Sequence, residues 1–135
     1  MLKINKKFLL TLLAFTLPFG CFGCSESSSE SSSATYVQIN GAEAKALMDS
    51  ESGYIIIDAR TQSEYDEGHI SGAILIPEYE IASRAENELP DKDQLILVYC
   101  RSGRRSKIAA EELVKLGYTN VKEFGGIIDW DYETV

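Results

Sequence analysis

The sequence predicts a three-layer α/β sandwich in which a mostly parallel sheet carries helices on both faces. Two observations lead to this prediction. Short apolar segments alternate with segments of helical periodicity along residues 35–135, and this order is typical of parallel strands joined by helices. In addition, the run at 54–57 is apolar at consecutive positions, as expected of a strand that helices cover on both sides.

The first expected elements are a short strand at 36–39 and a helix at 41–49. Asn40 is suited to cap the helix, because its side chain can accept from the first free backbone N–H groups. The spacing of three apolar residues places them on one face of this helix: Ala44, Leu47 and Met48. The strand at 54–57 then leads into Asp58.

A short helix is expected at 61–67, where Thr61 and Glu64 have the spacing of a capping box and Gly68 ends the helix. The next apolar strand covers 73–76 and is closed by Pro77. A weaker helical pattern follows at 78–89.

The strongest strand pattern of the chain lies at 95–99, and the strongest helical pattern at 103–116 follows it directly. Gly117 has the position of the residue after the helix, where a left-handed conformation is common. A last strand is expected at 121–124. After it, Gly125 and Gly126 should form a turn into a final helix that carries Trp130 for core packing.

Residues 1–23 have the pattern of a secretory signal peptide, with three lysines, an apolar run and then small residues. The apolar run at 8–19 is too short for a comfortable membrane span, which needs about 20 residues. A retained N-terminal anchor helix is the alternative.

Cys21 and Cys24 each follow a glycine at the end of this run, an arrangement that resembles the lipobox of bacterial lipoproteins. Pro18 and Cys21 stand where that motif usually carries leucine. The resemblance implies acylation, with Cys24 favoured because a Ser/Glu-rich tether, 24–34, begins there. The expected location is the outer face of a bacterial membrane or the periplasm, and cleavage with release of a soluble protein is the alternative.

Charge separates the folded part from the leader. Three of the 13 basic residues and no acid lie in the first 24 positions, so the rest of the chain holds 10 basic and 21 acidic residues, a formal charge of −11. This balance argues against nucleic acid as a partner. Four of those 10 basic residues lie between positions 101 and 107, directly after a cysteine.

Cys100 is the only cysteine of residues 35–135. A disulfide framework and an internal dithiol redox cycle are therefore not expected. Cys100 and His69 cannot supply a tetrahedral zinc shell, so a metal is not expected. No other cofactor is expected either.

The segment 99–106 is predicted to run from a strand through a short polar loop into a helix. Its backbone N–H groups, the helix dipole and the arginines would favour the thiolate of Cys100. Gly103 allows a tight turn around the sulfur, and Ser106 can donate a hydrogen bond to whatever Cys100 carries. A buried structural cysteine is the alternative.

Four motifs in order make the chain resemble the rhodanese family. The loop 100–106 is similar to its active-site loop, and 58–60 to its Asp-x-Arg motif. Residues 64–73 resemble its Glu-x-x-x-Gly-His-Ile-x-Gly-Ala signature, and 125–130 its closing Gly-Gly-x-x-x-Trp.

The resemblance implies a rhodanese-like fold and a sulfurtransferase that holds sulfane sulfur as a persulfide on Cys100. The implied partners are a small anionic donor and a thiol or protein acceptor. In the implied loop, backbone amides stabilise the persulfide and the three arginines can bind the anionic donor. The substrate-binding residues are Arg101, Ser102, Gly103, Arg104, Arg105 and Ser106. Asp58 and Arg60 are implied as an ion pair that supports the site, with a substrate role for Arg60 left open, and His69 as a structural hydrogen-bonding residue.

Two other functions remain as alternatives. Related phosphatases and arsenate reductases place an arginine after a cysteine and five further residues, where this chain has Ser106. A non-catalytic persulfide-delivery or protein-binding module is the second alternative, because many rhodanese-like domains have lost the cysteine that Cys100 would supply.

Overall fold

The computed structural model describes residues 35–135. The predicted signal peptide and tether, with Cys21 and Cys24, lie outside the described residues. Within the described part, no helix has both the length and the apolar character needed to cross a membrane.

A sheet of five parallel strands forms the centre of the fold, in the order β1-β5-β4-β2-β3. Its strands are β1 Val37–Gln38, β2 Ile55–Asp58, β3 Ala73–Leu75, β4 Ile96–Cys100 and β5 Val121–Gly126. After β2 the chain continues to β3 at one edge of the sheet, and after β4 it continues to β5 on the opposite side. Ligands of parallel sheets bind at the carboxyl ends of strands at such a point, and Cys100 is the last residue of β4.

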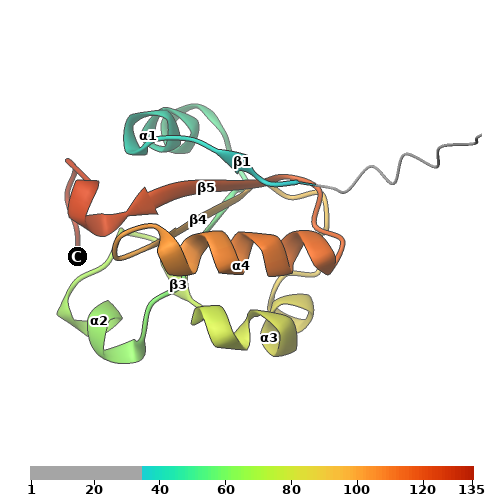
Figure 1. Cartoon of the computed structure of the whole chain (residues 1–135). Coiled ribbons are helices and arrows are strands. Elements are labelled where there is room, and N and C mark those ends of the chain that lie inside the picture. The colour runs from blue at the N-terminus through green and yellow to red at the C-terminus, as the bar shows by residue number, and fades with distance from the viewer. Residues whose placement is uncertain (1–34) are drawn as a thin grey trace, which may run out of the picture. The chain divides into compact units, whose positions relative to one another are not determined.

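Helices cover both faces of this sheet, which confirms the predicted three-layer α/β class. The four α-helices are α1 Gly41–Ser50, α2 Gln62–Glu67, α3 Ile81–Glu88 and α4 Arg104–Lys115. Helix α1 lies on one face, and α3 and α4 pack side by side on the other (Figure 1).

The alternation of side chains along the strands divides the core into two halves. In β4, Val98 and Cys100 belong to the half under α3 and α4, whereas Leu97 and Tyr99 belong to the half under α1. The side chain of Cys100 is therefore directed to the α4 face.

Local capping explains where the helices begin. Asn40 accepts from Glu43 N–H at 2.8 Å, and Glu43 accepts in return from Asn40 N–H. Thr61 and Glu64 form the same reciprocal pair at the start of α2. Both predicted caps are confirmed, and Gly117 has the expected left-handed conformation with φ of 96°.

The helical stretch expected at 78–89 is confirmed, and it divides into two parts. A 3₁₀ turn, η1 Glu78–Glu80, leads directly into helix α3. The backbone N–H of Glu78 donates to the carbonyl of Ala59, which ties this first turn to the end of β2.

The predicted final helix is a single 3₁₀ turn, η2 Ile127–Asp129, and Trp130 follows it in extended conformation. The Trp130 ring packs 5.6 Å from that of Phe124, at the edge of the core half under α1. Past this point Thr134 pairs with Ile70 in an antiparallel bridge. These contacts hold the end of the chain extended.

Candidate active site

The sulfur of Cys100 occupies the place of a helix cap. Three residues separate the end of β4 from the start of α4, and Gly103 stands at the N-cap position with φ of 99°. No side chain caps α4; instead the N–H of Gly103 donates to Cys100 Sγ at 3.0 Å. An anion at this position interacts favourably with the positive end of the helix.

Hydrogen bonds stabilise the ionised form of this sulfur. Burial raises the pKa of the Cys100 thiol, since the side chain is only 1% exposed. Donors outweigh that penalty and bring the pKa below its ordinary value. They are the hydroxyl of Ser106, whose Oγ lies 3.4 Å from Sγ, and the amides of Ser106, Gly103 and Ser102. The thiolate is thus favoured mainly by the loop's own donors.

The three arginines of the loop have different surroundings. Arg101 and Arg104 are exposed. Arg105 instead holds Glu64 of α2 through two parallel bonds of 2.7 and 2.8 Å. Its hydrogen bonds lower the pKa of Glu64 to about 2. Arg105 therefore links α4 to α2. The sequence predicts Arg105 as a contact for the donor and does not predict this ion pair.

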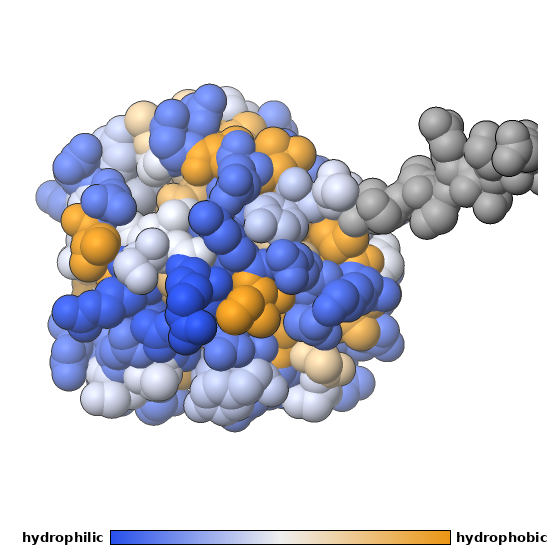
Figure 2. All heavy atoms as spheres, in the orientation of Figure 1, coloured by the Kyte–Doolittle hydropathy of each residue, from blue (hydrophilic) through white to orange (hydrophobic). Residues whose placement is uncertain are grey.

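The surface around α4 is mainly hydrophilic, and apolar side chains reach it in separate patches (Figure 2). Helix α4 itself carries one exposed large apolar residue, Ile108, at 38% exposure. The exposed arginines and their neighbours on α4 thus belong to a polar face, one suited to a charged rather than an apolar ligand.

A bulge in β5 brings the backbone of that strand against the loop. Val98 pairs with Glu123, but Cys100 pairs with Gly126, so β5 contains one extra residue. A Cβ atom at Gly126 would lie 2.1 Å from the carbonyl oxygen of Arg101. The glycine pair was predicted as a turn before a helix; it serves instead as the bulge that admits the loop.

Glu123 is a residue of this site that sequence reasoning missed. It is 2% exposed, and its carboxylate accepts from the Ser106 hydroxyl at 2.6 Å. A Cβ atom at Gly103 would lie 3.9 Å from the same carboxylate. The signal available in the sequence was an acid inside the predicted strand at 121–124, where it stands between Lys122 and Phe124.

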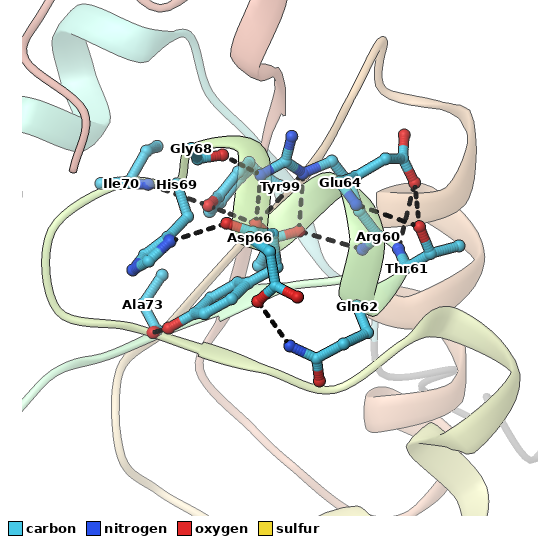
Figure 3. Close-up of polar contacts among 12 residues, drawn as sticks. Arg60, Thr61, Gln62, Glu64, Asp66, Gly68, His69, Ile70, Ala73 and Tyr99 are labelled. Carbon is cyan, nitrogen blue, oxygen red and sulfur yellow. Dashed lines mark hydrogen bonds and ion pairs between the residues drawn. The ribbon is translucent and has the colours of Figure 1, made fainter.

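Asp58 and Arg60 form a buried ion pair, as the family resemblance implies. Figure 3 shows Arg60 together with Gly68, whose carbonyl it also contacts. Arg60 donates to both carboxylate oxygens, at 2.7 to 3.1 Å, and also to the carbonyl of Gly68. Asp58 further accepts from the Tyr99 hydroxyl at 2.6 Å. Asp58 and Tyr99 belong to the α1 side of the sheet, so this cluster fixes the ends of β2 and β4 from the face opposite Sγ.

His69 lies beside the same cluster, and its ring stacks on that of Tyr65 with centroids 3.7 Å apart. Its Nδ1 donates to the carbonyl of Tyr65, and its backbone pairs with that of Val135. These contacts agree with a structural role. Among the described residues, no group of three or more potential ligands could hold a metal ion.

A family model described as the rhodanese-like domain matches residues 40–133. The chain belongs to the rhodanese-like family. This match covers strands β2 to β5, the loop after β4 and the Asp58–Arg60 cluster, so the four motifs that resembled this family lie inside it.

Rhodanese relatives with a sulfurtransferase name match more than half of the chain. It is 42% identical over 73 residues to the thiosulfate sulfurtransferase PspE of Escherichia coli, covering 54% of this chain and 70% of that protein. It is 40% identical over 77 residues to a sulfurtransferase of Allochromatium vinosum, covering 56% and 70%. A rhodanese of E. coli, solved with anions, is 39% identical with a TM-score of 0.58 and covers 61% of this chain and 96% of that structure. These rhodanese relatives support a sulfurtransferase.

Proposed function

We propose that this chain moves sulfane sulfur from a small anionic donor such as thiosulfate, through a persulfide on Cys100, to a thiol or protein acceptor. The observation that carries the proposal is the position of Sγ at the start of α4, where Gly103 N–H donates to it at 3.0 Å. This arrangement suits a sulfur atom that carries negative charge.

The reaction consists of two displacements at sulfur. The Cys100 thiolate attacks the outer sulfur of the donor, and an S–S bond forms as the S–S bond of thiosulfate breaks and sulfite leaves with the electron pair. An acceptor thiolate then attacks the outer persulfide sulfur and releases the Cys100 thiolate. Amides of 101–106 stabilise the charge at each stage, so no cofactor is needed.

Arg101 and Arg104 are the proposed contacts for the anionic donor, because both are exposed beside the loop. Arg105 acts indirectly, by holding α4 against Glu64. The E. coli rhodanese solved with anions supports an anionic ligand for this family. Two features favour sulfur over phosphate chemistry. Ser106 stands where the related phosphatases have an arginine, and the neighbouring Arg105 is paired with Glu64.

We further propose export and lipid anchoring through Cys24, or Cys21, with the domain at the outer face of a bacterial membrane or in the periplasm. The charge pattern and the small-residue zone of 1–24 support this location. The mass of the mature chain from the membrane fraction tests it. Loss of acyl mass in Cys24→Ser, but not in Cys21→Ser, is expected.

Mass spectrometry of the full chain after incubation with thiosulfate tests the function. The expected result is a gain of one sulfur atom on the peptide that contains Cys100, reversed by an added thiol. Cys100→Ser is the matched control and should gain nothing. Absence of the added sulfur with several donors would overturn the proposal, and phosphatase turnover that depends on Cys100 would replace it.

A further inference from the structure

A buried carboxylate lies behind the sulfur site without a basic partner among residues 35–135. Glu123 Oε1 accepts from the Ser106 hydroxyl at 2.6 Å and from Gly125 N–H at 2.8 Å, and Oε2 accepts from Gln38 at 3.3 Å. All three donors are neutral. A buried carboxylate held only by neutral donors pays a large desolvation cost when it is ionised.

The Ser106 hydroxyl connects this carboxylate to the sulfur. It has one hydrogen, and four acceptors surround its oxygen: Glu123 Oε1 at 2.6 Å, Gly103 O at 3.1 Å, Cys100 Sγ at 3.4 Å and Gly125 O at 3.4 Å. An ionised carboxylate at the shortest distance attracts that hydrogen most strongly. Ser106 then has only a lone pair to offer to the sulfur, which suits a thiol and not a thiolate.

We propose that Cys100 and Glu123 share one proton through the Ser106 hydroxyl, with Glu123 as the residue that takes up the thiol proton when the sulfur ionises. This inference rests on the proposed function, in which the thiolate is the reacting form. Glu123 does not touch the sulfur, so it is a positioning residue that acts through Ser106.

The proton transfer is balanced within the three side chains. The S–H bond of Cys100 breaks and its proton passes to Ser106 Oγ, while the Oγ–H proton passes to Glu123 Oε1. The sulfur keeps the electron pair, and the charge of the set stays at −1. Ser106 now donates to the thiolate, and the protonated carboxyl donates to Ser106. No oxidant, reductant or solvent base is required.

Other charges near the three side chains are either paired or more distant. Arg105 of α4 interacts with the charge of Cys100, and Arg105 is itself paired with Glu64 of α2. The charges of Glu111 and Glu123, after burial itself, raise the pKa of Tyr36. Glu111 is exposed on α4, and its carboxylate, like that of Glu123, acts on Tyr36. Unlike Glu123, it has no hydrogen bond to Ser106.

The pH dependence of Cys100 alkylation by iodoacetamide, followed on its peptide by mass spectrometry, tests the shared proton. In the unmodified chain, thiolate should form in two steps, because groups that interact by more than about one pK unit titrate as a pair. In Glu123→Gln it should form in one step, at least about one pH unit below the upper step. The amide can keep the hydrogen bonds of the carboxylate, but it cannot take up a proton.

Glu111→Gln is the matched control, since it removes the same charge from an exposed site, and it should leave both steps in place. Ser106→Ala removes the connection and should also give a single step, so it tests the proposal even where Glu123→Gln fails to fold. Coinciding curves for the unmodified chain and a folded Glu123→Gln or Ser106→Ala variant would overturn the shared proton.

This outcome is separate from that of the proposed function. Alkylation requires only the thiolate, whereas the transfer of sulfur requires a donor. Two-step alkylation without sulfur loading by any donor would keep the shared proton and reject the transferase. Sulfur loading with single-step, Glu123-independent alkylation would do the reverse.

Discussion

At the scale of single residues, Cys100 has two roles in one position. Its side chain belongs to the buried core half under α3 and α4, yet its sulfur accepts hydrogen bonds from the loop that follows. Burial alone would make it an inert structural cysteine. The donors around Sγ reverse that effect, because their hydrogen bonds stabilise negative charge on the buried sulfur.

Cys100→Ala should abolish sulfur loading but cost only about 1 kcal/mol of unfolding free energy. The change removes one sulfur atom and leaves the backbone of the loop intact. Urea unfolding beside the mass measurement checks both parts. A loss of several kcal/mol would mean that the residue acts mainly in packing. Cys100→Ser, which changes the polarity of the side chain more, serves for comparison.

Glu64→Gln should make the free energy of unfolding depend less on pH in the acidic range. The folded pKa of Glu64 lies at about 2, below its ordinary value of 4.5, so the unfolded chain takes up this proton first as the pH falls. The carboxylate therefore stabilises the fold above pH 4.5, and that contribution disappears as the pH falls toward 2. Because the pair is partly exposed, roughly 1 kcal/mol is expected.

Urea unfolding between neutral pH and pH 3 measures this difference. The unmodified chain should exceed Glu64→Gln in stability at neutral pH, and the two should converge in acid. Asp66→Asn, an exposed acid on the same helix, is the control and should show no such convergence. A constant gap across the range would contradict the pairing of Glu64 with Arg105.

At the scale of elements, the site depends on where β4, β5 and α4 meet. The bulge in β5 shifts the register so that Gly126, not Gly125, lies beside Cys100. The missing side chain at Gly126 lets the loop carbonyl of Arg101 approach the strand. The hydrogen bonds to Sγ exist because this contact fixes the loop between β4 and α4.

Gly126→Ala should lower stability by about 2 kcal/mol or more and also reduce sulfur loading. The new methyl group would meet backbone atoms of the loop at 2.1 to 2.6 Å, and backbone cannot move aside as a flexible side chain can. Gly41→Ala is the matched control, because its methyl group would meet the Trp130 ring at an ordinary 3.4 Å. Equal effects of the two changes in urea unfolding would contradict this account.

At the scale of the whole molecule, charge is unevenly distributed. Outside the leader the chain has a formal charge of −11, yet its exposed arginines gather at the candidate site. An acidic protein repels small anions in general, so a local basic cluster is needed to attract them. This contrast favours a small anionic ligand over a large polyanion.

Arg104→Glu should raise the KM for thiosulfate several-fold and leave kcat nearly unchanged, because it removes attraction before the chemical step. The advantage of the unmodified chain should shrink as ionic strength rises. Lys115→Glu, the same change of charge at the far end of α4, is the control. An unchanged KM in Arg104→Glu at low salt would remove this residue from donor binding.

The sequence by itself determined the parts of this protein that depend on local pattern. Apolar runs identified the strands, the capping boxes at Asn40 and Thr61 identified two helix starts, and the motif after β4 identified Cys100 as the candidate site. Such signals are read from neighbouring residues, because strand periodicity and helix capping act over a few positions. The final helix expected to carry Trp130 was wrong, since distant backbone contacts hold that end of the chain extended.

Only the tertiary structure decided which side chains meet. Arg105 pairs with Glu64 across 41 positions, and Ser106 bonds to Glu123 across 17. A charge in a sequence does not name its partner, because many pairings satisfy the same composition. The packing of α4 against β5, with Arg105 reaching Glu64 of α2, selects one of them. The position of the sulfur at the end of a strand can therefore be predicted from the sequence. The donors and the buried carboxylate around it are brought together only by the fold.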